Sequence, residues 1–365
     1  MNGIVLIKEG KIIAVGEKDK IAVPKDAEVL DCTKRTIVAG FWNSHVHFDE
    51  QKWRNAATLP AVRLTEKLYA MLMRYGFTSV VDLGSLTVNT NALRQRIDSG
   101  EIVGPRILIA GALFPPNGIP FYVRETLSPE LLSELAQPAT PAEAIHFVDK
   151  EIAEGADFIK LFAVSWISGF PNGKTKSMPL DIIQAVTTKM HRRGKLVFAH
   201  PSLIEGVELS LQGHVDILAH TIEDPEHWTD SLIERLKKAN IALIPTLMVI
   251  SQNGKHESIL HEVKSFADVG GQILFGTDVG FLTNYDPTKE YELLSQAGLT
   301  FSQILASLTT APAARFGFAS TSGRIAQGMD ADLVVLDGDP AQDIRAFSKV
   351  KYTLRKVQVI ARSVN

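Results

Sequence analysis

The stretch Phe41-Trp42-Asn43-Ser44-His45-Val46-His47-Phe48 follows the apolar run Thr36-Ile37-Val38-Ala39-Gly40, which is typical of a buried β-strand. Successive side chains of a strand point to opposite faces, so His45 and His47 point the same way and Val46 points the other way. Two parallel imidazoles at a strand end supply half of a metal site, although two solvated loop histidines would show the same pattern. The metal interpretation therefore requires further ligands at matching places in the chain.

The composition is that of an ordinary globular protein of 365 residues with a formal net charge of -3. A chain of this length can hold one large domain and a smaller one. The small negative charge argues against nucleic acid or an anionic membrane as a partner, and no apolar run approaches the ~20 residues of a membrane helix. No secretory signal is visible, and Cys32 is the single cysteine, which fits a reducing compartment. We therefore expect a cytoplasmic protein that acts on a small-molecule substrate; a homo-oligomer is compatible with the sequence.

Both ends of the chain are rich in short strands. The apolar runs 4–7 and 11–15 flank a Glu-Gly turn, which predicts a β-hairpin. Further apolar runs near the C-terminus have the same texture, at 331–337, 352–354 and 357–360. We expect a small β-sandwich domain that is built from both chain termini, residues 1–41 and 321–365.

The middle of the chain alternates short apolar strands with helical segments. Helical periodicity begins near Pro141 and again near Asp181. Together with the His-bearing strand, the strand candidates number eight; the other seven are 78–82, 106–110, 158–162, 196–200, 217–220, 241–245 and 272–276. This pattern predicts an α/β fold with a (β/α)₈ TIM barrel over residues 42–320. A doubly wound open sheet is the alternative, but no Gly-x-Gly-x-x-Gly turn follows the first strand.

Several polar residues fall at the C-terminal ends of the predicted strands, where barrel enzymes place their chemistry. Besides the first histidine pair, these residues are Lys160, His200, His220 and Asp278. Independent core histidines would not fall repeatedly at the same end of a barrel. Three other histidines lie within helical segments or turns and are expected to be structural or solvated: His146, His191 and His214.

The chain resembles the amidohydrolase superfamily over nearly its whole length, and within it the prolidase-like and imidazolonepropionase-like branch. The stretches that carry the resemblance are 40–47, 155–160, 197–200, 215–220, 274–278 and the tail 309–336. Relatives with a lysine at the fourth strand carry it as a carbamate, formed with CO₂, that bridges two metal ions. Such a reaction needs a neutral amine, and burial lowers the pKa of a lysine.

The resemblance implies a centre of two divalent metal ions, for which Zn²⁺ suits the ligands best. His45, His47, carboxylated Lys160 and Asp278 would hold one ion. Lys160, His200 and His220 would hold the other. If Lys160 were instead a buried lysine paired with Asp278, the site would be mononuclear, as in imidazolonepropionase-type relatives.

The implied activity is hydrolysis of an amide or peptide-like C–N bond by a hydroxide that bridges the metals. Asp278 would be the catalytic residue, taking the hydroxide proton and passing it to the leaving amine. A dipeptide or an N-acyl amino acid is the expected substrate. A cyclic-amide hydrolase or deaminase with a mononuclear site is the alternative, and a non-catalytic scaffold is a third reading that the complete ligand set disfavours.

The loop after the third strand, residues 114–124, departs from the Gly-Gly-His-Gly-like segment of prolidase-like relatives. Phe121, Tyr122 and Trp166 are candidates for an apolar wall of the substrate pocket. The alternative is that they only pack within their loops. Arg124 is a candidate for binding a substrate carboxylate, against a solvated surface arginine.

Overall fold

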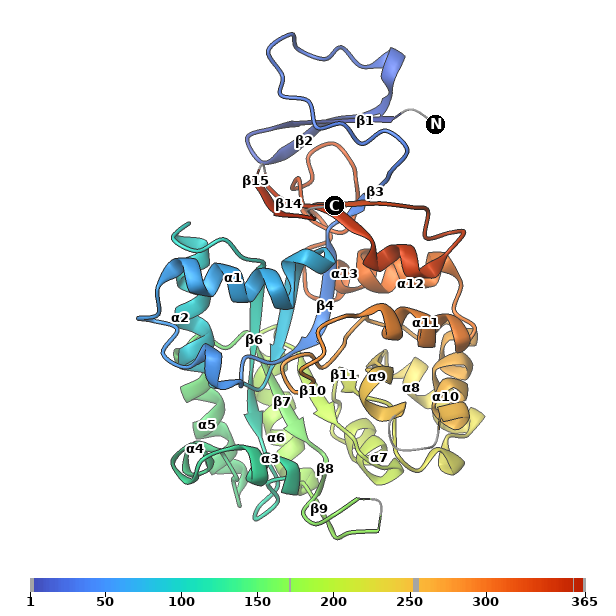
Figure 1. Ribbon diagram of the computed structural model, residues 1–365. Coiled ribbons are helices and arrows are strands. Elements are labelled where there is room, and N and C mark those ends of the chain that lie inside the picture. The colour runs from blue at the N-terminus through green and yellow to red at the C-terminus, as the bar shows by residue number, and fades with distance from the viewer. Residues whose placement is uncertain (1–2, 171, 252–255, 357, 364–365) are drawn as a thin grey trace.

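The computed structural model describes residues 3–170, 172–251, 256–356 and 358–363. Its centre is a parallel sheet of seven strands in the order β12-β11-β10-β7-β6-β5-β4 (Figure 1). These strands are β4 (Phe41–Val46), β5 (Phe77–Leu83), β6 (Arg106–Leu113), β7 (Phe158–Phe162), β10 (Val197–His200), β11 (Ile217–Ala219) and β12 (Ala242–Ile244). Nearly all of their residues are buried, which explains the continuous apolar runs in the sequence.

The eighth strand, expected at 272–276, is not a regular strand. Its backbone nevertheless bonds to both neighbours: the Leu274 N–H donates to the Leu243 carbonyl (2.9 Å), and the Ser44 N–H donates to the Phe275 carbonyl (2.7 Å). Only isolated bridges form, from Ile273 to Leu243 of β12 and, beyond the segment, from Val279 to Val46 of β4, which are too few for a ladder. The seven strands and this extended segment therefore make a nearly closed barrel.

Helices follow the strands and cover the outside of the sheet (Figure 1). The helix expected from Pro141 is confirmed as Pro141–Ala153. It begins there because the Thr140 side chain accepts a hydrogen bond from the Glu143 N–H and caps the helix. The helices are α1 (Ala61–Met71), α2 (Thr87–Asp98), α3 (Phe121–Thr126), α4 (Pro129–Glu134), α5 (Pro141–Ala153), α6 (Leu180–His191), α7 (Ile204–Gln212), α8 (Asp230–Lys238), α9 (Leu247–Ile250), α10 (His256–Asp268), α11 (Thr288–Gln296), α12 (Phe301–Leu308) and α13 (Thr310–Arg315). Short 3₁₀ turns lie at η1 (Lys18–Lys20), η2 (Gln51–Trp53), η3 (Met73–Tyr75), η4 (Pro225–His227) and η6 (Ile344–Ser348).

The two faces of the strands bury different sets of side chains. On β7, Ile159 and Leu161 pack in the large cluster between sheet and helices, whereas Phe158 packs with side chains of the other strands in a second cluster. Lys160 is two residues after Phe158, so it shares the face of Phe158, further along the strand. Strand alternation thus carries Lys160 toward the C-terminal mouth of the barrel.

The chain termini form two further sheets at one end of the molecule (Figure 1). A hairpin joins β1 (Gly3–Lys8) and β2 (Lys11–Glu17), and β3 (Thr36–Ala39) joins a four-stranded sheet with β13 (Leu333–Leu336), β14 (Val350–Arg355) and β15 (Gln358–Arg362). Ile12 of the hairpin packs with Leu333 and Val335 of the larger sheet. That both ends build one β-rich region is therefore observed, while a separate sandwich domain with boundaries at 41 and 321 stays a prediction.

One strand assignment changes at the junction of these regions. The apolar run 36–39 does not continue into the His-bearing strand, because it pairs with β13 in the terminal sheet. The barrel strand begins at Phe41, after Gly40, whose N–H donates to the Asp332 carbonyl (2.7 Å). A Cβ on Gly40 would lie 2.2 Å from Thr78 Oγ1, so only glycine lets the chain pass from one sheet to the other here.

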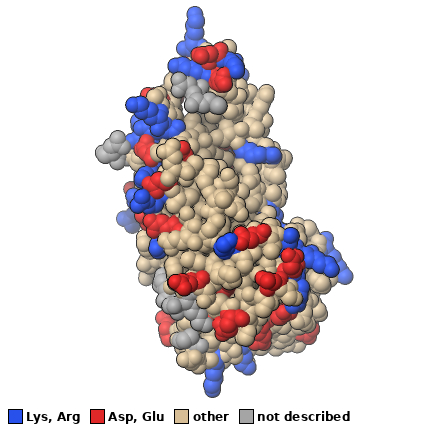
Figure 2. Space-filling model, turned by 90° about the vertical axis from the view of Figure 1, so that its right-hand side faces the viewer, with Lys and Arg blue, Asp and Glu red and all other residues tan. Residues whose placement is uncertain are grey.

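A second small hairpin, β8 (Val164–Trp166) with β9 (Thr175–Ser177), lies with α3 and α4 at the end of the barrel away from the terminal sheets (Figure 1). Basic and acidic side chains are mixed over the face shown in Figure 2. None of the helices within the described ranges combines the length and apolar character needed to cross a membrane.

Candidate metal centre

Three side-chain atoms meet in a triangle at the end of β4. His45 Nε2 lies 3.2 Å from His47 Nε2, and Asp278 Oδ1 lies 3.1 Å from the first and 2.9 Å from the second. The two histidines therefore point the same way, as strand alternation predicts. Ligands at about 2.0–2.1 Å from a tetrahedral zinc ion lie about 3.3 Å from one another, so the triangle has the dimensions of a metal-binding face.

Backbone contacts hold Asp278 beside the histidines. Its own N–H donates to the His45 carbonyl (2.9 Å), and its φ of 58° is in the left-handed region. Asn43 links the same two segments, since its Nδ2 donates to Thr277 Oγ1 (2.7 Å). The irregular eighth segment and β4 thus position the carboxylate together.

Lys160 reaches the same cluster from β7. Its Nζ lies 3.3 Å from His45 Nε2 and 5.1 Å from the centre of the Phe162 ring, and the side chain is buried. In the part of the chain that the structure describes, no carboxylate lies within 4.0 Å of this Nζ. The lysine is therefore buried among imidazoles without a direct counter-ion.

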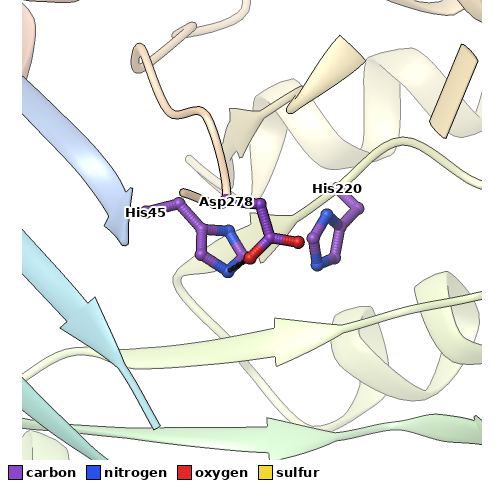
Figure 3. A group of neighbouring side chains, drawn as sticks. All are labelled: His45, His220 and Asp278. Atoms are coloured by element: carbon purple, nitrogen blue, oxygen red, sulfur yellow. Dashed lines mark ion pairs between the residues drawn. The ribbon is translucent and has the colours of Figure 1, made fainter. Parts of the chain in front are cut away.

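His200 and His220 complete the cluster from the ends of β10 and β11. The centre of the His220 ring lies 4.7 Å from the centre of the His45 ring and 4.6 Å from that of the His200 ring. His200 also stacks on Phe162, with 4.7 Å between ring centres. Figure 3 shows the Asp278 carboxylate between the imidazoles of His45 and His220; these three side chains offer ligand atoms within 4.8 Å of one another.

Burial governs the protonation of the cluster. It lowers the pKa of His45 to about 3 and holds the pKa of His220 well below its ordinary value, so both imidazoles are neutral and can donate lone pairs. Burial also lowers the pKa of Lys160 to about 8, although Asp278 opposes this shift. For Asp278 itself, burial raises the pKa, but His45 and His47 outweigh it and keep the carboxyl ionised.

These residues fit a cation. The buried Oδ1 atom of Asp278, which faces the Nε2 atoms of His45 and His47, has no hydrogen-bond partner within the described ranges, which is costly unless a cation binds there. Neutral imidazoles and an ionised carboxylate are the ligands that divalent transition metals prefer. The cluster is therefore a candidate centre for divalent metal.

A cavity of about 920 Å³ opens beside the centre. Phe121, Tyr122 and Trp166 line it, together with Lys160 and Asp278. Arg124, in contrast, is exposed, donates to the Ile167 carbonyl and is not among the lining side chains. The structure thus brings the three aromatic candidates to the cavity, and carboxylate binding by Arg124 stays a prediction.

Three further residues around the centre were not among the candidates from the sequence. Thr246 Oγ1 lies 2.5 Å from His220 Nδ1, and Glu223 lines the cavity with its Oε2 2.7 Å from Trp166 Nε1. Asp82, at the end of β5, is buried and accepts hydrogen bonds from the hydroxyls of Ser85 and Thr90. Position at a strand end could have singled out Asp82; nothing local marks Glu223 or Thr246.

Known proteins resemble this chain over nearly its whole length. The Amidohydrolase family profile matches residues 36–364. Ochratoxinase of Aspergillus niger is 24% identical over 95% of this chain and 80% of that protein, and guanine deaminase of Escherichia coli K12 is 24% identical over 96% and 84%. A prolidase solved in complex with N-methylphosphonate-L-proline has the same fold, with a TM-score of 0.79 at 24% identity over 98% of this chain and 94% of that chain.

Proposed function

The chain belongs to the amidohydrolase family, in its prolidase-like branch, and is a metal-dependent hydrolase of C–N bonds; from this premise we propose that it cleaves an amide or peptide-like bond at a binuclear centre. His45, His47, Lys160 and Asp278 would hold one divalent ion. A carbamate on Lys160 would bridge to the second, which His200 and His220 would hold. Bound Zn²⁺ ions would supply Lewis acidity and lower the pKa of a water molecule.

The observation that carries the binuclear proposal is the environment of Lys160. Its Nζ is buried, 3.3 Å from His45 Nε2, with no carboxylate within 4.0 Å in the described part of the chain. An ammonium ion there would be desolvated beside neutral imidazoles, without a direct counter-ion. Conversion of the amine to a carbamate would replace the cation with a two-oxygen anion that can bind metal.

Asp278 is proposed to move the proton during hydrolysis. Its Oδ1 lies between the Nε2 atoms of His45 and His47, and the carboxyl stays ionised, so it can accept a proton from the attacking water. Because the residue also lines the cavity, the same oxygen can return this proton to the leaving amine. Asp278 would therefore act first as base and then as acid.

The cavity supports a small organic substrate, for which a dipeptide or an N-acyl amino acid is proposed. Its volume of about 920 Å³ is at the upper end of the range for small-molecule sites, and aromatic side chains make up much of the wall near the centre. The similar proteins do not all have the same type of activity, since one is a prolidase and another is a deaminase.

The test is to measure metal content and then activity on the same protein. About two metal ions per chain, with hydrolysis in a library of dipeptides, N-acyl amino acids and cyclic amides, would support the proposal. A fully active protein with one ion per chain would contradict the binuclear centre.

The second candidate is a mononuclear cyclic-amide hydrolase or deaminase. It is favoured by the compact set of His45, His220 and Asp278, whose ligand atoms lie within 4.8 Å of one another and could hold one ion without Lys160. The similarity to guanine deaminase also favours this second candidate. Turnover of a cyclic amide or aminopurine with one ion per chain would favour this candidate.

A further inference from the structure

We propose that one part of the cavity, which we name the lateral arm, binds an alkyl chain of the substrate. The enzyme would then prefer N-acyl amino acids with a long aliphatic acyl chain over those with a short one. The arm is the part of the cavity that is lined by the apolar side chains of Leu86, Val88, Ala92, Leu131, Leu135 and Phe147. This inference rests on the proposed amide hydrolysis and names the substrate class within it.

The lateral arm is continuous with the candidate metal centre. Lys160 pairs in register with Ala112 of β6, and a Cβ on Gly84, directly after β5, would lie 3.0 Å from the Ala112 Cβ. All three residues line the same cavity. Neighbouring strands lie about 4.8 Å apart, so the cavity extends sideways from β7 across β6 to β5 over roughly 10 Å. Small residues at Ala112 and Gly84 leave this passage open.

Three helices surround the arm beyond β5. α2 lies beside α5, because Thr87 Oγ1 donates a hydrogen bond to the Glu151 carboxylate between them. α4 lies on the same side of the barrel as these two helices (Figure 1), and the Phe114 N–H donates to the carbonyl of Ala136, just beyond α4 (2.9 Å). The arm therefore leads from the mouth of the barrel outward between α2, α4 and α5.

The wall of the arm is mainly aliphatic. Of its six apolar side chains only Phe147 is aromatic, whereas the wall near the metal centre contains Phe121, Tyr122 and Trp166. Leu86 and Val88 are 38% and 60% exposed, which places them at the open end of the arm. A methylene chain that enters the arm would bury apolar surface on both itself and these side chains, which favours binding.

The charged side chains lie mostly at the rim. Among the described residues that line this part of the cavity, those with charged side chains are Arg54, Glu134, Lys150, Glu151 and Glu154, and only Glu151 is buried. Burial raises the pKa of Glu151, although the hydrogen bond from Thr87 opposes the shift. A carboxyl that favours its neutral form can border an alkyl chain at less cost than an ionised one. The interior of the arm thus fits an uncharged aliphatic chain.

The experiment compares N-acetyl-, N-hexanoyl- and N-decanoyl-L-alanine, which differ only in the length of the acyl chain. The purified full-length protein with its metal should hydrolyse them with a kcat/KM that rises about 10- to 100-fold from the acetyl to the decanoyl compound, because each methylene in the arm is buried. Val88→Asp puts a charge into the wall. It should lower kcat/KM for the decanoyl compound about 10-fold and leave that for the acetyl compound unchanged.

The matched control is Val62→Asp. Val62 is the second residue of α1 as Val88 is of α2, and it is 67% exposed, but it is not among the side chains that line the cavity. An aspartate in the first turn is favourable for both helices, so both variants should fold. Val62→Asp should leave all three kcat/KM values unchanged. Equal kcat/KM for the three compounds in the unmodified protein, or the same values in the two variants, would overturn the inference while amide hydrolysis stands.

Direct binding separates failure of the arm from failure of the proposed reaction. Octanol should bind the unmodified protein more tightly than butanol in calorimetric titration, and Val88→Asp, but not Val62→Asp, should reduce this difference. If none of the N-acyl alanines is hydrolysed but this pattern is seen, amide hydrolysis is in doubt and the arm stands. Equal binding of the two alcohols, or equal octanol binding by the two variants, would overturn the arm.

Discussion

The Nδ1 atom of His220 lies 2.5 Å from the Oγ1 of Thr246, which in turn donates its hydroxyl proton to the Pro245 carbonyl (2.8 Å). A hydroxyl has one proton, and with this proton on the Pro245 carbonyl Oγ1 accepts from His220 Nδ1, so that Nδ1 carries the imidazole proton. The Nε2 atom of His220 is therefore left with a lone pair for a metal. One threonine hydroxyl thus selects the tautomer of a candidate ligand.

Replacement of Thr246 with Val should weaken metal binding without removing a ligand. Loss of the hydroxyl frees the His220 ring to change its tautomer and orientation, and loss of such an outer contact lowers metal affinity about 10- to 100-fold. Competition with a chelator measures this affinity. Thr246→Ser keeps the hydroxyl and is the matched control; equal affinities of the Val and Ser variants would contradict the role of this contact.

Lys160→Ala should lose metal and activity, and a short carboxylate such as propionate should restore part of both. The vacated volume beside His45 could admit a carboxylate in the place of the proposed carbamate. Metal content and turnover, with and without propionate, are the measurements. Full activity of the variant without added carboxylate would contradict the carbamate.

Asp278→Asn should lower kcat about 10²- to 10⁴-fold, because an amide cannot take up and return the proton as a carboxylate does. The substitution keeps the shape of the side chain between His45 and His47. Metal analysis must accompany the kinetics, since loss of the ion alone would also abolish turnover. Retained metal together with near-normal turnover would contradict the proton-transfer role.

Glu290 should make the stability of the protein depend on pH. Burial raises its pKa to about 8, although the N–H groups of Leu247 and Met248 donate to its oxygens at 2.9 and 2.7 Å and oppose the shift. Between these two pKa values, about 4.5 in the unfolded chain and about 8 in the folded chain, the folded chain binds more protons. The contribution of Glu290 to the free energy of unfolding therefore falls as pH rises from about 4.5 to 8. Urea unfolding of Glu290→Gln between these limits should show a flatter profile than the unmodified protein; parallel profiles would contradict the assignment.

Gly280 should tolerate alanine poorly, because two effects combine there. Its φ is 108°, and a Cβ would lie 2.0 Å from the carbonyl oxygen of His47. Gly270 has a φ of 81° but no atom within 4 Å of such a Cβ, so it isolates the backbone effect. We expect Gly270→Ala to cost about 1–2 kcal/mol of unfolding free energy and Gly280→Ala clearly more, measured by urea unfolding. Equal losses would show that the loop at Gly280 relaxes without disturbing His47.

The sequence alone predicted the parts of the fold and site that local pattern encodes. Alternation along β4 places His45 and His47 on one face, and apolar runs at regular spacing predicted seven of the parallel strands. His200 and His220 could be selected because they lie at the C-terminal ends of such runs, and Lys160 because it is a charged residue within one. These are properties of residues close together in the chain, and strand geometry translates them directly into direction.

Only the tertiary structure decided the contacts between distant segments. The run 36–39 leaves the barrel because it pairs with β13, and 272–276 is too irregular for a ladder although it bonds to both neighbours. The partners Trp166 and Glu223 are 57 residues apart, and His220 and Thr246 are 26 residues apart. Each such contact depends on how whole strands are arranged around the barrel, which no local periodicity records, and the contact between His220 and Thr246 supports a candidate metal ligand.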